Sequence, residues 1–81
     1  MKMGIHKFKT TKGNTLIVDI GKNITYAHLE DRDGHWLANY GSISVPKLGE
    51  QDGQTIITFN EFDPQRLRRI AVRPVITFTL E

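Results

Sequence analysis

The stretch Asn23–Pro46 constrains the fold most, because it holds Asp33-Gly34 between two runs of β-prone residues. Asp-Gly between such runs is typical of a two-residue β-hairpin loop with a type I′ turn, which needs positive φ at both central residues. The same stretch holds the only Trp and both Tyr of the chain. Large aromatic side chains supply much of the burial in a small domain. We therefore expect this hairpin to be central, with the other strands laid against it.

The position of the turn also predicts the register of the hairpin. The expected pairs are Arg32–His35, Asp31–Trp36, Leu29–Ala38, His28–Asn39, Ala27–Tyr40, Tyr26–Gly41 and Ile24–Ile43. Paired residues point to the same face of a sheet, and successive residues point to opposite faces. This register places Trp36 and Tyr40 on one face and His28 on the other.

Further β-prone runs predict strands at residues 5–10, 14–20, 55–59 and 75–80, so that about six strands are expected in all. Their alternating apolar positions predict a core of Leu16, Val18, Ile57, Phe59, Ile76 and Phe78. The segment Lys47–Gln54 carries Gly and acidic residues and few apolar ones, so we expect an exposed loop there. Asp63-Pro64 is typical of a helix start, and Pro74 disfavours helix before it, which predicts one short helix near 64–71.

The predicted fold class is therefore mainly β, a small barrel or sandwich of about six antiparallel strands with that one helix. The order of elements, with a helical turn before the last strand, resembles that of small SH3-like barrels. The length of 81 residues indicates a single domain over 1–81. The longest apolar run has three residues and the first residues lack the apolar core of a signal peptide, so we expect no membrane span and a cytoplasmic protein.

Residues that could act in catalysis or bind a metal are present, but they do not form a recognised motif. Asp31, Asp33 and Gly34 have the spacing of part of a calcium-binding loop, yet Ser42 stands where the final bidentate Glu belongs. The three His are not at metal-binding spacing, and no Cys is available. Neither a nucleophile elbow nor a phosphate-binding loop is present in the sequence. We therefore expect no enzyme activity, no metal and no cofactor.

Charge is distributed unevenly along the chain, although the net charge is only +2. Residues 1–22 carry five Lys and one Asp, residues 23–63 carry a net charge of −5, and residues 64–81 carry +3. The last segment contains a cluster of arginines, namely Arg66, Arg68, Arg69 and Arg73. Arg side chains bind phosphate and carboxylate groups in a bidentate manner, so this cluster is a candidate binding site. It could equally be a solvated face that pairs with the acidic middle of the chain.

Three functions fit these features. The first two are binding functions, and the third is an enzyme or small-ligand binder that works as an oligomer, with a site at the subunit junction. Trp, Tyr and Arg are the residues that most often anchor protein interfaces, and here Trp36 and Tyr40 join the arginine cluster as candidate contacts. We therefore predict a small protein-binding module that docks on a larger protein as an inhibitor or adaptor, as accessory proteins of phages and mobile elements often do. The alternative is a nucleic-acid-binding β-barrel that uses the Lys-rich first hairpin and Arg66–Arg73. A homodimer is a further expectation, because open sheet edges favour self-association.

Overall fold

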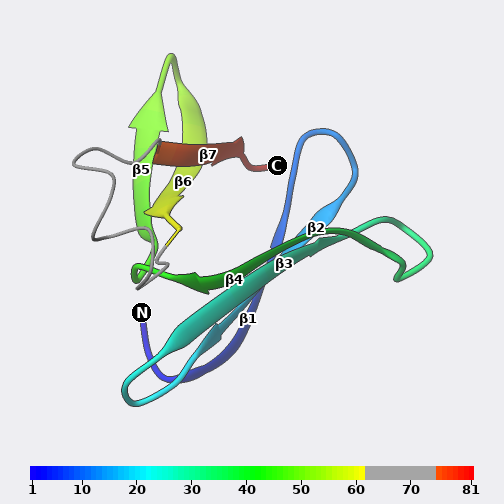
Figure 1. Ribbon diagram of the computed structural model, residues 1–81. Helices are drawn as coiled ribbons and strands as arrows, with labels where there is room; N and C mark the ends of the chain where they lie inside the picture. The colour runs from blue at the N-terminus through cyan, green and yellow to red at the C-terminus, as the bar shows by residue number, and fades with distance from the viewer. Residues whose placement is uncertain (62–74) are drawn as a thin grey trace.

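The structure is a computed structural model that describes residues 1–61 and 75–81. The described chain folds into antiparallel strands joined by short turns (Figure 1). The strands are β1 (Gly4–Lys9), β2 (Thr15–Ile20), β3 (Thr25–Glu30), β4 (Trp36–Ile43), β5 (Lys47–Gln51), β6 (Gln54–Asn60) and β7 (Val75–Thr79). They form a four-stranded sheet in the order β1-β2-β3-β4 and a three-stranded sheet in the order β5-β6-β7. The mainly β, antiparallel class is thus confirmed.

The two sheets share one core between their inner faces. Its fully or nearly fully buried side chains come from β2, β3, β4 and β6, and they are Leu16, Val18, Ile20, Ala27, Ile43, Ile57 and Phe59. Burying one such aliphatic or aromatic side chain stabilises the fold by roughly 1.5–3 kcal/mol. Four of the six predicted core residues belong to this set. The other two, Ile76 and Phe78, are half-buried and pack against it from β7.

The sheets do not close into a barrel in the described part of the chain, so the SH3-like form of the prediction is wrong. Single bridges join them at two places, Thr10 to Leu80 and Ile43 to Glu61, and no continuous ladder crosses from one sheet to the other there. The break between the sheets follows β4, where the buried Pro46 has no N–H to donate to a ladder. The chain therefore starts a second sheet at β5 instead of extending the first.

The segment Lys47–Gln54 is not a loop, and residues 1–61 and 75–81 form seven strands rather than six. Residues 47–51 pair with β6 up to Gln51 opposite Gln54, which leaves Asp52-Gly53 as a two-residue turn. Asp52 and Gly53 have φ of 54° and 78°, the positive values of a type I′ turn. After this turn, β6 runs back along β5. The backbone hydrogen bonds between the two strands hold β5 in the sheet, although β5 has few apolar side chains. The predicted helix near 64–71 lies outside the described residues.

Residues 1–61 and 75–81 contain no helix with the length and apolar character that a membrane crossing requires.

Candidate binding surface

The four-stranded sheet turns one face to the core and the other to solvent, and aromatic, basic and polar side chains gather on the solvent side. Side chains of residues paired across neighbouring strands form rows, because paired residues share a face. The rows are Ile5–Asp19–Tyr26–Ser42, Lys7–Ile17–His28–Asn39 and Lys9–Thr15–Glu30–Trp36. We call the surface made by these three rows the outer face.

A stacked pair of rings is the most ordered feature of the outer face. The ring centroids of His28 and Trp36 lie 3.7 Å apart, and the two planes differ by only 9°. His28 Nε2 lies 2.6 Å from Glu30 Oε2, and both side chains are mostly shielded from solvent. Trp36 is nevertheless 59% exposed. The arrangement thus fixes the orientation of a large aromatic ring while leaving most of it available for contact.

An apolar groove extends this surface at the other end of β3 and β4. Its volume is about 460 Å³, and residues 23–26 and 42–45 line it. Ile24, Tyr26 and Val45 are each about half exposed at this groove. Tyr26 belongs to both the groove and the outer face, so the two features form one continuous surface along β3.

Two irregularities in β4 decide which aromatic side chain faces outward. The register against β3 shifts twice, because β4 has one extra residue at Leu37 and another at Tyr40. Glu30 therefore pairs with Trp36, where the sequence predicted Asp31 as the partner. Since a shift of one residue moves a side chain to the opposite face, Trp36 joins His28 on the outer face. The predicted pairs of Leu29 with Ala38 and His28 with Asn39, which lie between the two bulges, are confirmed.

Tyr40 lies on the other side of the sheet, in contact with the core. Its ring meets Phe59 and Phe78 edge-on, with centroid distances of 5.4 and 6.0 Å. Burial raises the pKa of the Tyr40 hydroxyl, and the nearby charge of Glu61 raises it further. Tyr40 thus links the two sheets, and the structure does not bring it together with Trp36 into one surface.

The arginine cluster of Arg66, Arg68, Arg69 and Arg73 lies outside the described residues. The structure therefore neither joins it to the outer face nor separates it from that face.

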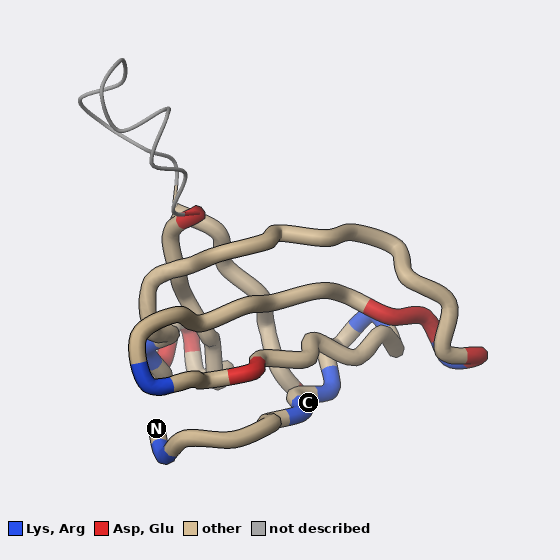
Figure 2. Tube along the Cα trace, turned by 60° about the horizontal axis from the view of Figure 1, so that its bottom comes forward, with Lys and Arg blue, Asp and Glu red and all other residues tan. Residues whose placement is uncertain are grey.

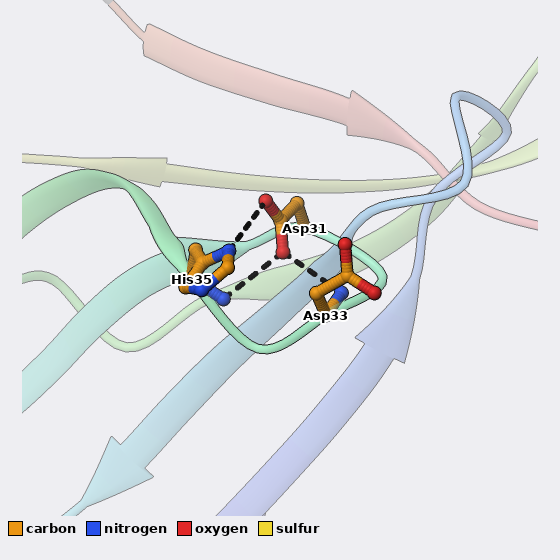
Figure 3. Close-up of side chains that lie close together, drawn as sticks. All are labelled: Asp31, Asp33 and His35. Carbon is orange, nitrogen blue, oxygen red and sulfur yellow. Dashed lines mark hydrogen bonds and ion pairs between the residues drawn. The ribbon is translucent and has the colours of Figure 1, made fainter.

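The turn between β3 and β4 gathers the acidic residues that resembled part of a metal-binding loop (Figure 3). One possible ligand atom from each of Asp31, Asp33 and His35 lies within 4.8 Å of the other two. Figure 2 shows this acidic turn at the tip of the hairpin. The Asp31 carboxylate, however, already accepts hydrogen bonds within the turn: its Oδ1 accepts from the backbone N–H of Asp33 at 2.8 Å and of His35 at 2.9 Å.

These hydrogen bonds give Asp31 a structural role in the turn. This role accounts for the acidic residues at these positions without a metal. The backbone N–H of His35 is the main reason that the pKa of Asp31 lies below its ordinary value of 3.8. Burial has the next largest effect and raises the pKa, whereas the N–H of Asp33 and the imidazole of His35 lower it further. The carboxylate therefore stays ionised and holds the turn closed. In the described part of the chain, His6 and His28 do not join this cluster.

Tyr26 and His28 belong to the outer face, although the sequence analysis did not select them. Lys7 and Lys9 belong to the Lys-rich first hairpin of the nucleic-acid alternative. Each lies at an alternate position of a strand, so period-two alternation could have placed them on one face. The bulge at Leu37, which places Trp36 on that face, could not be predicted from the sequence.

No protein-family model, no curated protein and no solved structure matches this chain.

Proposed function

We propose that this protein is a small non-catalytic binding module that docks on a larger protein, as an inhibitor or adaptor, through the outer face of its four-stranded sheet. The observation that supports this proposal is the exposed Trp36 ring held against His28. A ring that is already ordered loses little conformational freedom on binding, and Trp is the residue most enriched among interface hot spots.

The surroundings of Trp36 fit a protein partner better than a small molecule. Exposed apolar side chains stand at the two ends of this surface, Trp36 at one end and Tyr26 with Ile24 at the other, and polar groups such as His28 and Asn39 lie between them. Exposed Trp and Tyr side chains among polar groups fit a protein interface, where aromatic residues are enriched. The groove at Ile24 and Tyr26 offers a place for one apolar side chain of the partner.

The test compares the capture of proteins from the source cell by three forms of the protein, after nuclease treatment. The forms are wild type, Trp36→Ala and Leu48→Ala. Leu48 is a matched control because it is 55% exposed but lies on β5 of the other sheet. We expect Trp36→Ala to weaken binding to the purified captured partner by at least about 2 kcal/mol, roughly 30-fold, since Trp hot spots are of this size.

Leu48→Ala should bind like wild type, and circular dichroism should show the same fold for all three forms. If Trp36→Ala binds as tightly as wild type, the outer face is not the docking surface.

Nucleic-acid binding is the second candidate, and one observation favours it. Lys7 and Lys9 stand in the same rows as His28 and Trp36, so positive charges and a stacking ring share one face. The acidic groups of Glu30, next to the ring, and of the β3–β4 turn oppose phosphate binding there. Titration of a single-stranded oligonucleotide at several salt concentrations separates the two functions. Contacts from the two lysines would give a slope of about −1.4 in log affinity against log salt.

A further inference from the structure

β1 is an edge strand of the four-stranded sheet, and most of its outer edge is open in the described structure. Among residues 1–61 and 75–81, other segments contact this edge only at the C-terminal end of β1. There Thr10 forms a bridge with Leu80, and the N–H of Glu81 donates to the carbonyl of Lys9 at 3.0 Å. The stretch from Gly4 to Phe8 has β2 as its one neighbouring strand in the sheet.

The register shows which backbone groups face outward. Thr10 N donates to the carbonyl of Asn14 at 2.8 Å, so these two residues form a hydrogen-bonded pair. Hydrogen-bonded and non-bonded pairs alternate along an antiparallel ladder. Phe8, His6 and Gly4 therefore bond to β2, whereas Ile5, Lys7 and Lys9 turn their N–H and C=O groups to the open edge. The bond from Glu81 to Lys9 agrees with this assignment.

The open edge is also strongly basic. Residues 1–12 contain four Lys and no acidic residue. The side chains of Lys7 and Lys9 are exposed on the outer face and make no ion pair with any described acid. The edge thus combines outward-facing backbone groups with positive charges that form no ion pair with a described acid. Ile5, which is 66% exposed, adds an apolar contact at the same edge.

We propose that an extended acidic segment of the partner protein adds to β1 as a fifth strand of this sheet, which rests on the proposed role as a protein-binding module. Strand addition supplies affinity through main-chain hydrogen bonds, and side chains at alternate positions supply specificity. A side chain of the added strand directly opposite Lys7 would lie about 5 Å from it, where opposite charges stabilise the pairing. Glu81 already lies opposite Lys9, so the added strand pairs with the part of β1 that precedes Lys9.

A second copy of this chain fits the edge less well. Antiparallel pairing of two β1 strands about Lys7 would set Lys7 opposite its own copy, and like charges directly opposite one another destabilise a sheet. Lys7 thus disfavours self-pairing in this register, while it attracts an acidic strand.

β5 provides an internal control edge. Its two-residue turn makes Gln51 and Gln54 a hydrogen-bonded pair, so Leu48 and Glu50 face outward by the same alternation. This edge carries Lys47 and Glu50, of opposite charge, and does not favour an acidic strand.

The probe is a blocked eight-residue peptide of alternating valine and glutamate, compared with its valine–lysine counterpart. Amide hydrogen exchange and amide NMR shifts are followed during titration. We expect the acidic peptide to slow exchange at the Ile5 and Lys7 amides and to leave Leu48 and Glu50 unchanged. The basic peptide should bind at least about tenfold more weakly, since each exposed charge pair contributes up to about 1 kcal/mol.

Two variants complete the test. Lys7→Glu with Lys9→Glu should reverse the preference between the two peptides. Lys7→Pro removes an outward N–H that the fold does not use, a place where edge strands tolerate Pro, so it should abolish peptide binding and keep the fold. Three outcomes would overturn the proposal. They are protection of Leu48 and Glu50 as strong as that of Ile5 and Lys7, no protection of β1, and equal binding of both peptides by wild type.

Trp36→Ala distinguishes this inference from the proposed function. It should lose the protein partner but still bind the acidic peptide, because Trp36 lies on β4, at the opposite edge of the sheet. Partner capture that survives in Trp36→Ala refutes docking on the outer face and leaves the result at β1 standing.

Discussion

The two Asp-Gly pairs of this protein form different turns. Asp52-Gly53 is a two-residue type I′ turn with positive φ at both residues. In Asp33-Gly34, Gly34 alone has positive φ, at 83°. Its N–H donates to the carbonyl of Asp31, and Asp31 N donates to the carbonyl of His35. These bonds define a three-residue loop with a type I turn and a bulge at Gly.

The residue two positions before each Asp-Gly explains the difference. Asp31 has a short carboxylate that reaches the backbone N–H groups of Asp33 and His35. The corresponding residue in the other hairpin is Glu50, whose side chain is one methylene longer and is not a favoured residue for such local bonds. The dipeptide permits either turn, and the upstream side chain selects one.

The β1–β2 turn supports this explanation. Gly13 has a φ of 85°, its N–H donates to the carbonyl of Thr10, and Thr10 N donates to Asn14. Thr10 Oγ1 accepts from Asn14 N at 3.2 Å, as Asp31 accepts from His35 N. A side-chain acceptor three residues before Gly thus accompanies the three-residue loop in both cases.

The largest effect is expected at Gly13, where this loop is buried. A Cβ there would lie 2.9 Å from a guanidinium nitrogen of Arg32, in addition to the unfavourable positive φ. Gly13→Ala should therefore lower the free energy of unfolding by at least the cost of its positive φ, about 1–2 kcal/mol, and moving the guanidinium, the end of a flexible side chain, adds to this. In an Arg32→Ala background the same change should cost only about 1–2 kcal/mol. Urea unfolding of the four proteins measures this coupling, and equal costs in both backgrounds would show that Arg32 does not cover the turn.

A smaller and equal effect is expected at the two Asp-Gly turns. A Cβ at Gly34 would meet one oxygen of Glu30 at 4.0 Å, and a Cβ at Gly53 would meet nothing within 4 Å. Only the backbone conformation opposes Gly34→Ala and Gly53→Ala, so each should cost about 1–2 kcal/mol. Thermal and urea unfolding measure both. A cost near zero at either position would mean that its φ is not positive in solution.

The same comparison shows what the sequence could and could not predict. Strands with alternating β-branched residues, such as Thr15–Ile20, were predicted within one residue, because local pattern and burial agree there. β5 was missed because its pairing depends on the Asp52-Gly53 turn and not on its own exposed side chains. The outer face was missed because Trp36 reaches it through a bulge at Leu37, which depends on the loop that Asp31 selects. Because the turn was assigned to the wrong type, the predicted pairing of the residues next to it was also wrong.

Unfolding at acidic pH should reveal how much the Asp31 carboxylate contributes to the stability of its turn. The pKa of Asp31 in the folded protein lies below 3.8, so the folded state binds its proton less readily than the unfolded state. The stabilisation is therefore complete above pH 3.8 and is lost as the pH falls through the lowered pKa.

Asp31→Asn retains an acceptor oxygen but cannot ionise, so its difference in stability from wild type should shrink in acid. The effect at neutral pH should be smaller than that of either Gly substitution. Urea midpoints across the acidic range measure it, and a difference that stays constant with pH would contradict this role of the carboxylate.

The smallest effect is expected from replacing the Asp of each Asp-Gly pair by Asn. Asn adopts positive φ more readily than most residues and is strongly preferred before Gly in type I′ turns. Asp52→Asn should therefore raise stability, within about 0.5 kcal/mol as for other surface changes. Asp33→Asn removes the same single charge, but Asp33 does not have positive φ, so it should gain nothing. Asp33→Asn is thus the control for the loss of charge, and the difference between the two urea midpoints isolates the conformational effect. An equal gain at both positions would mean that Asp33 also samples positive φ, and that Asp31 does not hold the two turns apart.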